Sequence, residues 1–148
     1  MFSQTTEYAL RAMIALTAGS GSPTTTRAIA VAMKVPASYL SKVLQALVRA
    51  KLVRSTRGVK GGFVLARPAA GITLLDVVNA VNPLERITSC PLDLTNHSSE
   101  LCPLHRRLDE SLAQAETALR NTTLAELISE ENPCPTLRTQ LQQLQTLR

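Results

Sequence analysis

The sequence predicts a mainly α-helical fold: a winged helix-turn-helix with a small β-hairpin wing, followed by a long C-terminal helix. Two short amphipathic segments joined by a tight turn predict the helix-turn-helix. A glycine-rich hairpin directly after them predicts the wing. A stripe of apolar residues at helical spacing from Leu104 to Leu119 predicts the long helix.

Three helices are expected before the wing. Apolar residues at helical spacing predict the first over residues 3–17, with Ser3 as its cap. The second covers residues 27–33 and ends before Pro36, because the residue preceding a proline avoids the helical region. The third covers residues 38–50, and the face that it buries should consist of Leu40, Val43, Leu44, Leu47 and Val48.

The wing is expected within residues 52–67. Short strands at 52–53 and 63–65 flank a loop that is rich in glycine and cations. A glycine-rich hairpin is ordinary in itself. One that carries Arg57 and Lys60 directly after a helix-turn-helix is typical of a wing that contacts DNA phosphate or the minor groove.

A short helix, a loop and the long helix follow the wing. Thr73 should cap the short helix over residues 72–81. Residues 83–102 show no helical period and are expected to form a loop. Pro103 suits the first position of a helix that should run to about Arg120.

The C-terminal part should add two further helices. Thr123 and Glu126 have the spacing of a capping box, and residues 136–147 predict an amphipathic tail helix. The chain therefore divides into a winged helix-turn-helix (1–82), a cysteine/histidine loop (83–102) and a long helix with its tail (103–148).

Composition excludes several classes of protein. A hydrophobic fraction of 45% supports a core, whereas 3% aromatic residues argue against a sheet-rich enzyme or a stacking-based single-strand binder. No apolar run approaches the roughly 18–20 residues that a membrane span needs, and the N-terminus lacks a signal-peptide pattern. We therefore expect a cytoplasmic protein. Its three cysteines suit metal ligands or reactive thiols better than disulfides.

Charge is distributed unevenly along the chain. Residues 1–67 carry a net charge of +9 and residues 68–148 a net charge of −4. Such an asymmetry also occurs in proteins whose basic surface is simply solvated. Here it predicts that the basic part, residues 1–67, binds a polyanion. The side chains expected to contact DNA are those facing outward from the helix-turn-helix and the wing, namely Thr26, Ser38, Tyr39, Ser41, Lys42, Arg54, Arg57 and Lys60.

Cysteines and histidines gather around the loop. Cys90, His97, Cys102 and His105 offer two thiols and two imidazoles, which can hold a two-iron cluster or a tetrahedral zinc ion. Two other interpretations of these residues stay open: a thiol sensor without a metal, and a packed loop without sensing chemistry. Cys134 lies further along the chain, in the sequence NPCP. Three roles stay open for it: a residue unrelated to the loop, a resolving thiol, or a substitute ligand.

Several quoted segments resemble one family. The pieces are TEYALRAMIAL, SYL at the head of the third helix, RGVKGGFVLAR in the wing, ITLLDVVNAV, CPLHRRLDE and TTLAEL. They resemble the IscR/NsrR family of winged-helix transcription regulators, which are iron–sulphur or redox-sensing repressors. The resemblance implies a homodimer that joins through the long helix and binds double-stranded DNA at a palindromic operator. It also implies that Arg57 reaches the minor groove while Ser38, Tyr39 and Lys42 serve the major groove.

The same resemblance implies a cofactor, most directly a two-iron two-sulphur cluster. Cys90 and Cys102 match two of three family cysteines, but Asn96 replaces the middle one and His97 is the nearest substitute. His105 matches a histidine ligand of the family. Glu7 matches an acidic residue that, in some relatives, the partner subunit supplies as a ligand. Some relatives carry an acidic base-reading residue where this chain has Ser41, which leaves the operator sequence open.

Other functions fit the sequence less well than a transcription regulator. No nucleophile–base pair, phosphate loop or paired catalytic carboxylate indicates an enzyme. A protein–protein module without DNA does not account for the basic front half. The nearest alternative is a repressor of the same fold with no cofactor, with structural zinc or with a bare thiol switch.

Overall fold

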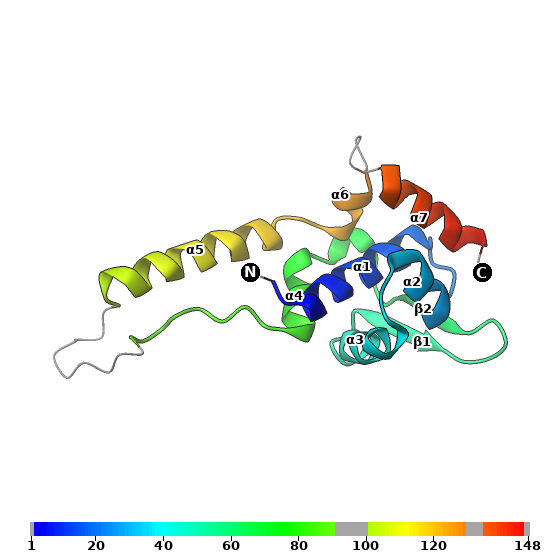
Figure 1. Cartoon of the computed structure of the whole chain (residues 1–148), viewed down its shortest axis with the longest axis horizontal. Coiled ribbons are helices and arrows are strands. Elements are labelled where there is room, and N and C mark those ends of the chain that lie inside the picture. Colours follow the sequence, from blue (N-terminus) through cyan, green and yellow to red (C-terminus); the bar gives the residue numbers. More distant parts are fainter. Residues whose placement is uncertain (1, 91–100, 130–134, 147–148) are drawn as a thin grey trace.

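The computed structural model describes residues 2–90, 101–129 and 135–146 (Figure 1). Within these ranges the fold is mainly helical with one two-stranded sheet, as the sequence predicts. The first three helices are α1 (Gln4–Ala18), α2 (Thr26–Met33) and α3 (Ala37–Arg49). Ser3 caps α1 as expected, because its side chain accepts a hydrogen bond from the Thr6 amide.

The turn between α2 and α3 fixes the helix-turn-helix. Lys34 adopts a left-handed conformation with φ of 52°, and its amide closes the end of α2. Val35 is buried, and Pro36 precedes the first turn of α3. Leu40, Val43, Leu44 and Leu47 form the buried face of α3, as predicted, whereas Val48 is only partly buried.

The wing consists of β1 (Val53–Thr56) paired antiparallel with β2 (Gly62–Leu65). The prediction of a first strand at 52–53 was wrong in its bounds. The strand reaches Thr56, whose hydroxyl donates to the Gly62 carbonyl and accepts from the Gly62 amide. Gly61 is required in the turn, because a Cβ atom there would lie 2.5 Å from the Thr56 carbonyl oxygen.

A further backbone bridge attaches the wing to the helix-turn-helix. The amide and carbonyl of Phe63 bond to the carbonyl and amide of Thr24, just before α2, at 2.9 and 3.0 Å. The wing is therefore anchored at its second strand, while the turn between the strands stays exposed.

The short 3₁₀ turn η1 (Ala69–Gly71) leads to α4 (Leu74–Val81). Thr73 caps α4, as predicted, within a capping box completed by Asp76. The expected start at residue 72 was early, because Ile72 is extended and its carbonyl accepts from the Leu124 amide.

The C-terminal helices are α5 (Pro103–Arg120), α6 (Leu124–Ser129) and α7 (Pro135–Thr146). The bounds of α5 agree with the prediction, and Glu126 and Thr123 complete the expected capping box at α6. Helix α7 packs on α2 and α1 and buries Leu144. No helix in the described ranges is both long and apolar enough to cross a membrane.

One core joins the winged domain to the C-terminal helices. It is built from α1, α2, α3 and α4, with Leu124 of α6 and Leu144 of α7 added at its border. By contrast, α5 buries no residue and extends away from this core, and the segment that follows α4 runs along the same side of the molecule (Figure 1). Two apolar side chains of α5, Leu104 and Leu108, are 61% and 47% exposed.

Candidate nucleic-acid interface and metal centre

The first turns of α3 present polar side chains to solvent. Ser38, Tyr39, Ser41 and Lys42 are all exposed, while Leu40 between them is fully buried. The Ser41 hydroxyl donates to the Ala37 carbonyl at 3.0 Å, so part of its hydrogen-bonding capacity is used within the helix. These four residues are therefore accessible to a ligand from the same end of α3.

Cations of the wing lie free of acidic partners. Arg54, Arg57 and Lys60 are exposed, and in the described part of the chain no carboxylate lies within ion-pair distance of them or of Lys42. Thr26, the remaining predicted DNA contact, is half-buried at the first position of α2. Unpaired cations on one hairpin give a surface suited to a polyanion.

Two other cations of the basic half are neutralised within the fold. Arg67 pairs with Asp76 at 2.8 Å, and Arg11 pairs with Glu7 one helical turn away. The net charge of +9 for the first 67 residues already counts Glu7, whereas Asp76 lies outside this part, so the pair with Arg67 lowers the positive charge presented to a ligand by one more.

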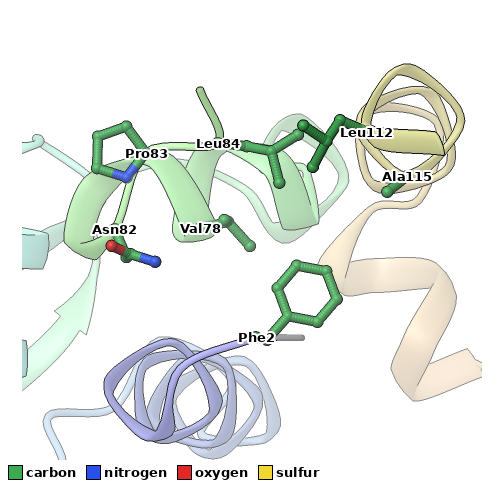
Figure 2. Close-up of a pocket in the computed structure, with 7 residues that line it drawn as sticks. All are labelled: Phe2, Val78, Asn82, Pro83, Leu84, Leu112 and Ala115. Atoms are coloured by element: carbon green, nitrogen blue, oxygen red, sulfur yellow. The ribbon is translucent and has the colours of Figure 1, made fainter. Parts of the chain in front are cut away.

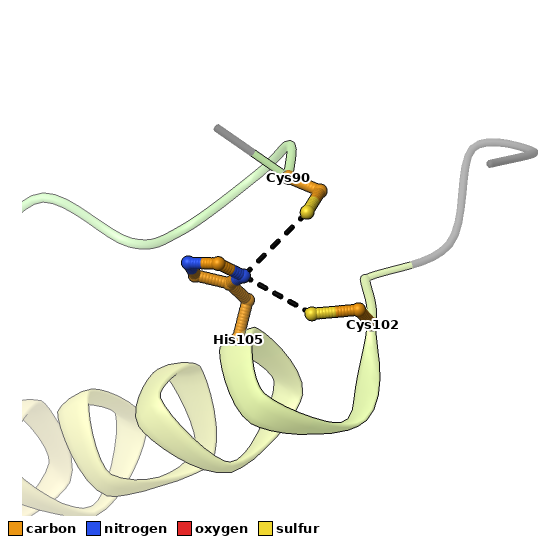
Figure 3. Close-up of side chains that lie close together, drawn as sticks. All are labelled: Cys90, Cys102 and His105. Carbon is orange, nitrogen blue, oxygen red and sulfur yellow. Dashed lines mark hydrogen bonds between the residues drawn. The ribbon is translucent and has the colours of Figure 1, made fainter. Parts of the chain in front are cut away.

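Cys90, Cys102 and His105 come together at the start of α5 (Figure 3). His105 Nδ1 lies 3.1 Å from the Cys102 sulfur and 3.6 Å from the Cys90 sulfur. The three ligand atoms lie within 4.8 Å of one another, and all three residues are half-buried. Within the described ranges this is the one group of its kind, and it contains the three residues that the sequence singles out most strongly.

The start of the helix makes one thiol acidic. Cys102 is the N-cap residue of α5. The backbone amide of His105, followed by its imidazole, donates hydrogen bonds that lower the pKa of Cys102 to about 7. Cys102 is therefore substantially a thiolate near neutral pH, which is the form that binds metals.

Of the remaining predicted ligands, the structure describes Glu7, which lies apart from this group. Glu7 lies on α1, where it pairs with Arg11, and it does not belong to the donor group of its own chain. His97, Asn96 and Cys134 lie outside the described residues.

An ion pair between the loop and α5 was missed in the sequence. Arg86 donates from Nε and Nη2 to the Asp109 carboxylate at 2.6 and 2.5 Å, and the Ile87 amide donates to the same carboxylate at 3.0 Å. The guanidinium beside it holds the pKa of Asp109 below its ordinary value. Asp109 follows His105 by four residues in CPLHRRLDE, so helical periodicity could have placed both on one face.

An apolar cavity of about 240 Å³ lies between the winged domain and α5 (Figure 2). Phe2 closes one side, Val78 and Leu84 lie opposite, and Leu112 and Ala115 reach in from α5. The cavity marks the junction at which α5 meets the rest of the fold.

Comparison with known proteins agrees with this description. Residues 2–130 match the Rrf2 family, described as an iron-dependent transcriptional regulator. Among solved structures, CymR of B. subtilis, described as the global cysteine regulator, is 29% identical, with a TM-score of 0.73 over 89% of this chain and 98% of that one. CymR of Staphylococcus aureus is 29% identical, with a TM-score of 0.68 over 88% and 99%. IscR of T. potens shares the fold at 23% identity, with a TM-score of 0.73 over 89% and 88%.

Proposed function

The chain belongs to the Rrf2 family of transcriptional regulators, and on that premise we propose that it is a homodimeric repressor controlled by a metal centre at Cys90, Cys102 and His105. Members of the family are DNA-binding regulators and not enzymes. The observation that carries the finer proposal is the convergence of two thiols and an imidazole within 4.8 Å. We divide the chain as before into the winged domain (1–82), the sensing loop (83–102) and the dimer region (103–148), and propose a cytoplasmic location.

In the proposed complex, α3 enters the major groove and the wing reaches an adjacent backbone or minor groove. Ser38, Tyr39, Ser41 and Lys42 are exposed on the leading turns of α3 and offer hydroxyls and a cation to base edges and phosphates. Arg57 is the residue we assign to the minor groove. Thr26, Arg54 and Lys60 would contact phosphates and so fix the position of the protein along the duplex.

Exposed apolar side chains on α5 support the homodimer. Leu104 and Leu108 lie one helical turn apart and are largely open to solvent. Burial of this face against a second copy would remove apolar surface from water and set two recognition helices at a fixed spacing. A two-fold dimer reads a palindromic operator, because its half-sites repeat the protein's symmetry.

The donor set fits a metal cofactor chemically. Cysteine thiolates and histidine are ligands of iron–sulphur clusters, and the family is described as iron-dependent. Cys90, Cys102 and His105 would hold a two-iron two-sulphur cluster, with His97 of the same chain or Glu7 of the partner subunit as the fourth ligand. Such a cluster would supply sensitivity to oxidants, nitric oxide or iron supply. The chain's own residues would then transmit the difference between loaded and empty states to α3 and the wing.

The spacing of the donor atoms favours zinc as a second candidate. In a tetrahedral zinc site, sulfur and nitrogen ligands lie roughly 3.6 Å apart, from the usual metal–ligand distances. The distances from His105 Nδ1 to the two sulfurs are 3.1 and 3.6 Å, close to that separation. A single ion would therefore fit this triangle with little rearrangement.

Purification without oxygen tests the proposal. We expect a coloured protein with near-stoichiometric iron and sulphide, lost in Cys102→Ser and kept in Cys134→Ser. A colourless protein with stoichiometric zinc would support the second candidate. A colourless protein that stays free of metal after cluster reconstitution would overturn the metal centre, and would leave a thiol switch or a repressor without a cofactor.

A further inference from the structure

The segment that carries Cys90 has no secondary structure of its own after α4 ends. Its first hydrogen bonds return to α4, from the Asn82 amide to the Val78 carbonyl at 2.9 Å and from the Leu84 amide to Asn79 Oδ1 at 3.1 Å. Most polar contacts that tie the next residues to α5 are made by one side chain, Asp109. Asp109 accepts two hydrogen bonds from Arg86 and one from the Ile87 amide.

Helical spacing explains why this contact bears on the metal site. Cys102, His105, Asp109 and Glu116 follow one another by three, four and seven residues, so they share one face of α5. All four are half-buried, whereas Leu104 and Leu108 are exposed. The face that meets the loop and the exposed apolar stripe are thus different sides of the helix.

The distances along the chain place the ion pair next to the site. Asp109 lies one turn from His105, about 6 Å along the helix surface. Ile87 precedes Cys90 by three residues, which span at most roughly 10 Å. Once Asp109 holds Ile87, Cys90 is restricted to a small volume that includes His105.

The contact has the geometry of a strong ion pair. Arg86 uses two nitrogens on the two carboxylate oxygens of Asp109, an arrangement that fixes orientation as well as distance. The Asp109 side chain is only 16% exposed, and Glu116 lies 3.7 Å from a third guanidinium nitrogen. Arg86 is therefore held from two turns of α5, unlike an isolated surface pair.

We propose that Asp109, through Arg86 and the Ile87 amide, is the positioning residue that presents Cys90 to Cys102 and His105. The inference rests on the proposed metal site for its functional meaning, but not for its test. Without the Asp109 carboxylate, the loop would lose the contact that holds Ile87 to α5, Cys90 would sample a larger volume, and the effective concentration of its thiol at the site would fall.

Asp109→Asn and Glu110→Gln form a matched pair of variants. Each removes one carboxylate charge from adjacent positions of α5. Glu110 pairs with Arg107 on the same helix, and within the described residues it forms no ion pair with the loop. Arg86→Gln removes the other side of the contact, and the double variant Arg86→Gln/Asp109→Asn should show no further loss beyond either single change.

The first readout needs no metal. In full-length Cys134→Ser protein, the Cys90 and Cys102 thiols are equilibrated with glutathione; one glutathione disulfide is reduced to two thiols as one protein disulfide forms. We expect Asp109→Asn to lower this equilibrium constant at least tenfold and Glu110→Gln to change it less than twofold. Thermal unfolding of each variant confirms that it is folded.

The second readout is the affinity for Co²⁺, followed by its visible absorption. Loss of a residue that orients a ligand typically lowers metal affinity by about 10–100-fold, and we expect that range for Asp109→Asn. Equal values for Asp109→Asn and Glu110→Gln in both readouts would overturn the inference while leaving the metal site intact. If the parent protein bound no metal, the proposed function would fail, and a selective effect on the disulfide equilibrium would still support the positioning role.

Discussion

Tyr8 of α1 meets Tyr39 of α3 edge to face, with ring centroids 6.1 Å apart and an interplanar angle of 69°. Tyr8 also accepts a hydrogen bond from the Gln4 side chain at 2.9 Å. Glu7, the candidate ligand for a partner's metal centre, is the residue before Tyr8. The start of α1 therefore touches the first turn of α3 directly.

We predict that Tyr8→Ala weakens operator binding, because Tyr39 loses the ring that orients it. An edge contact between aromatic rings contributes about 0.5–1.5 kcal/mol, so the loss should reach roughly tenfold at most. Fluorescence anisotropy on specific and nonspecific duplexes measures it. Tyr8→Phe keeps the ring and should bind like the parent protein; an equal loss in both variants would refute the role of the ring contact.

Arg57→Ala should weaken operator binding by about 1–3 kcal/mol, the range for an arginine that makes a specific contact. Arg57 is exposed on the wing and free of acidic partners in the described part of the chain. Titration at several salt concentrations should also show a shallower salt dependence, since fewer counterions are released. Arg106→Ala removes an exposed cation from α5 and serves as the control. An equal loss of operator affinity in Arg57→Ala and Arg106→Ala would argue against a contact between the wing and DNA.

Leu108→Asp should convert the dimer to a monomer at micromolar concentration. The substitution would place a carboxylate in the apolar face that we assign to the dimer, and an unpaired buried charge is strongly unfavourable. Sedimentation velocity separates the two species. Val59→Asp alters a fully exposed apolar residue of the wing and should stay dimeric; a dimeric Leu108→Asp protein would place the interface elsewhere.

Cys102 should react with iodoacetamide increasingly as pH rises through about 7 in metal-free protein. Its lowered pKa means that the thiolate predominates above that pH and is protonated below it. His105→Ala removes the imidazole hydrogen bond, so the midpoint should move upward toward that of an ordinary thiol. Mass spectrometry of the labelled peptides follows each cysteine. An unchanged midpoint in His105→Ala would mean that the imidazole does not stabilise the thiolate.

The elements that the sequence predicted well are those with local signals. Pro103 at a helix start, Thr73 before α4 and the pair Thr123 and Glu126 act within a few residues, and the structure confirms each of them. Helical spacing likewise identified the buried face of α3.

What the sequence missed depends on contacts between distant residues. The bridge between Thr24 and Phe63, the ion pair of Arg67 with Asp76, and that of Arg86 with Asp109 leave no local pattern. The same limit applies to the donor group. Residue type and resemblance singled out Cys90, Cys102 and His105, but only the path of the loop along α5 brings Cys90 to the other two.

We propose that the state of the Cys90, Cys102 and His105 centre controls DNA binding. The most direct test compares the affinity of metal-loaded and metal-free protein for one duplex selected from a random library, at fixed salt and without oxygen. We predict at least a tenfold difference between the two states, abolished in Cys102→Ser. Equal affinities of loaded and metal-free protein would mean that the metal centre is not the switch of this DNA-binding regulator.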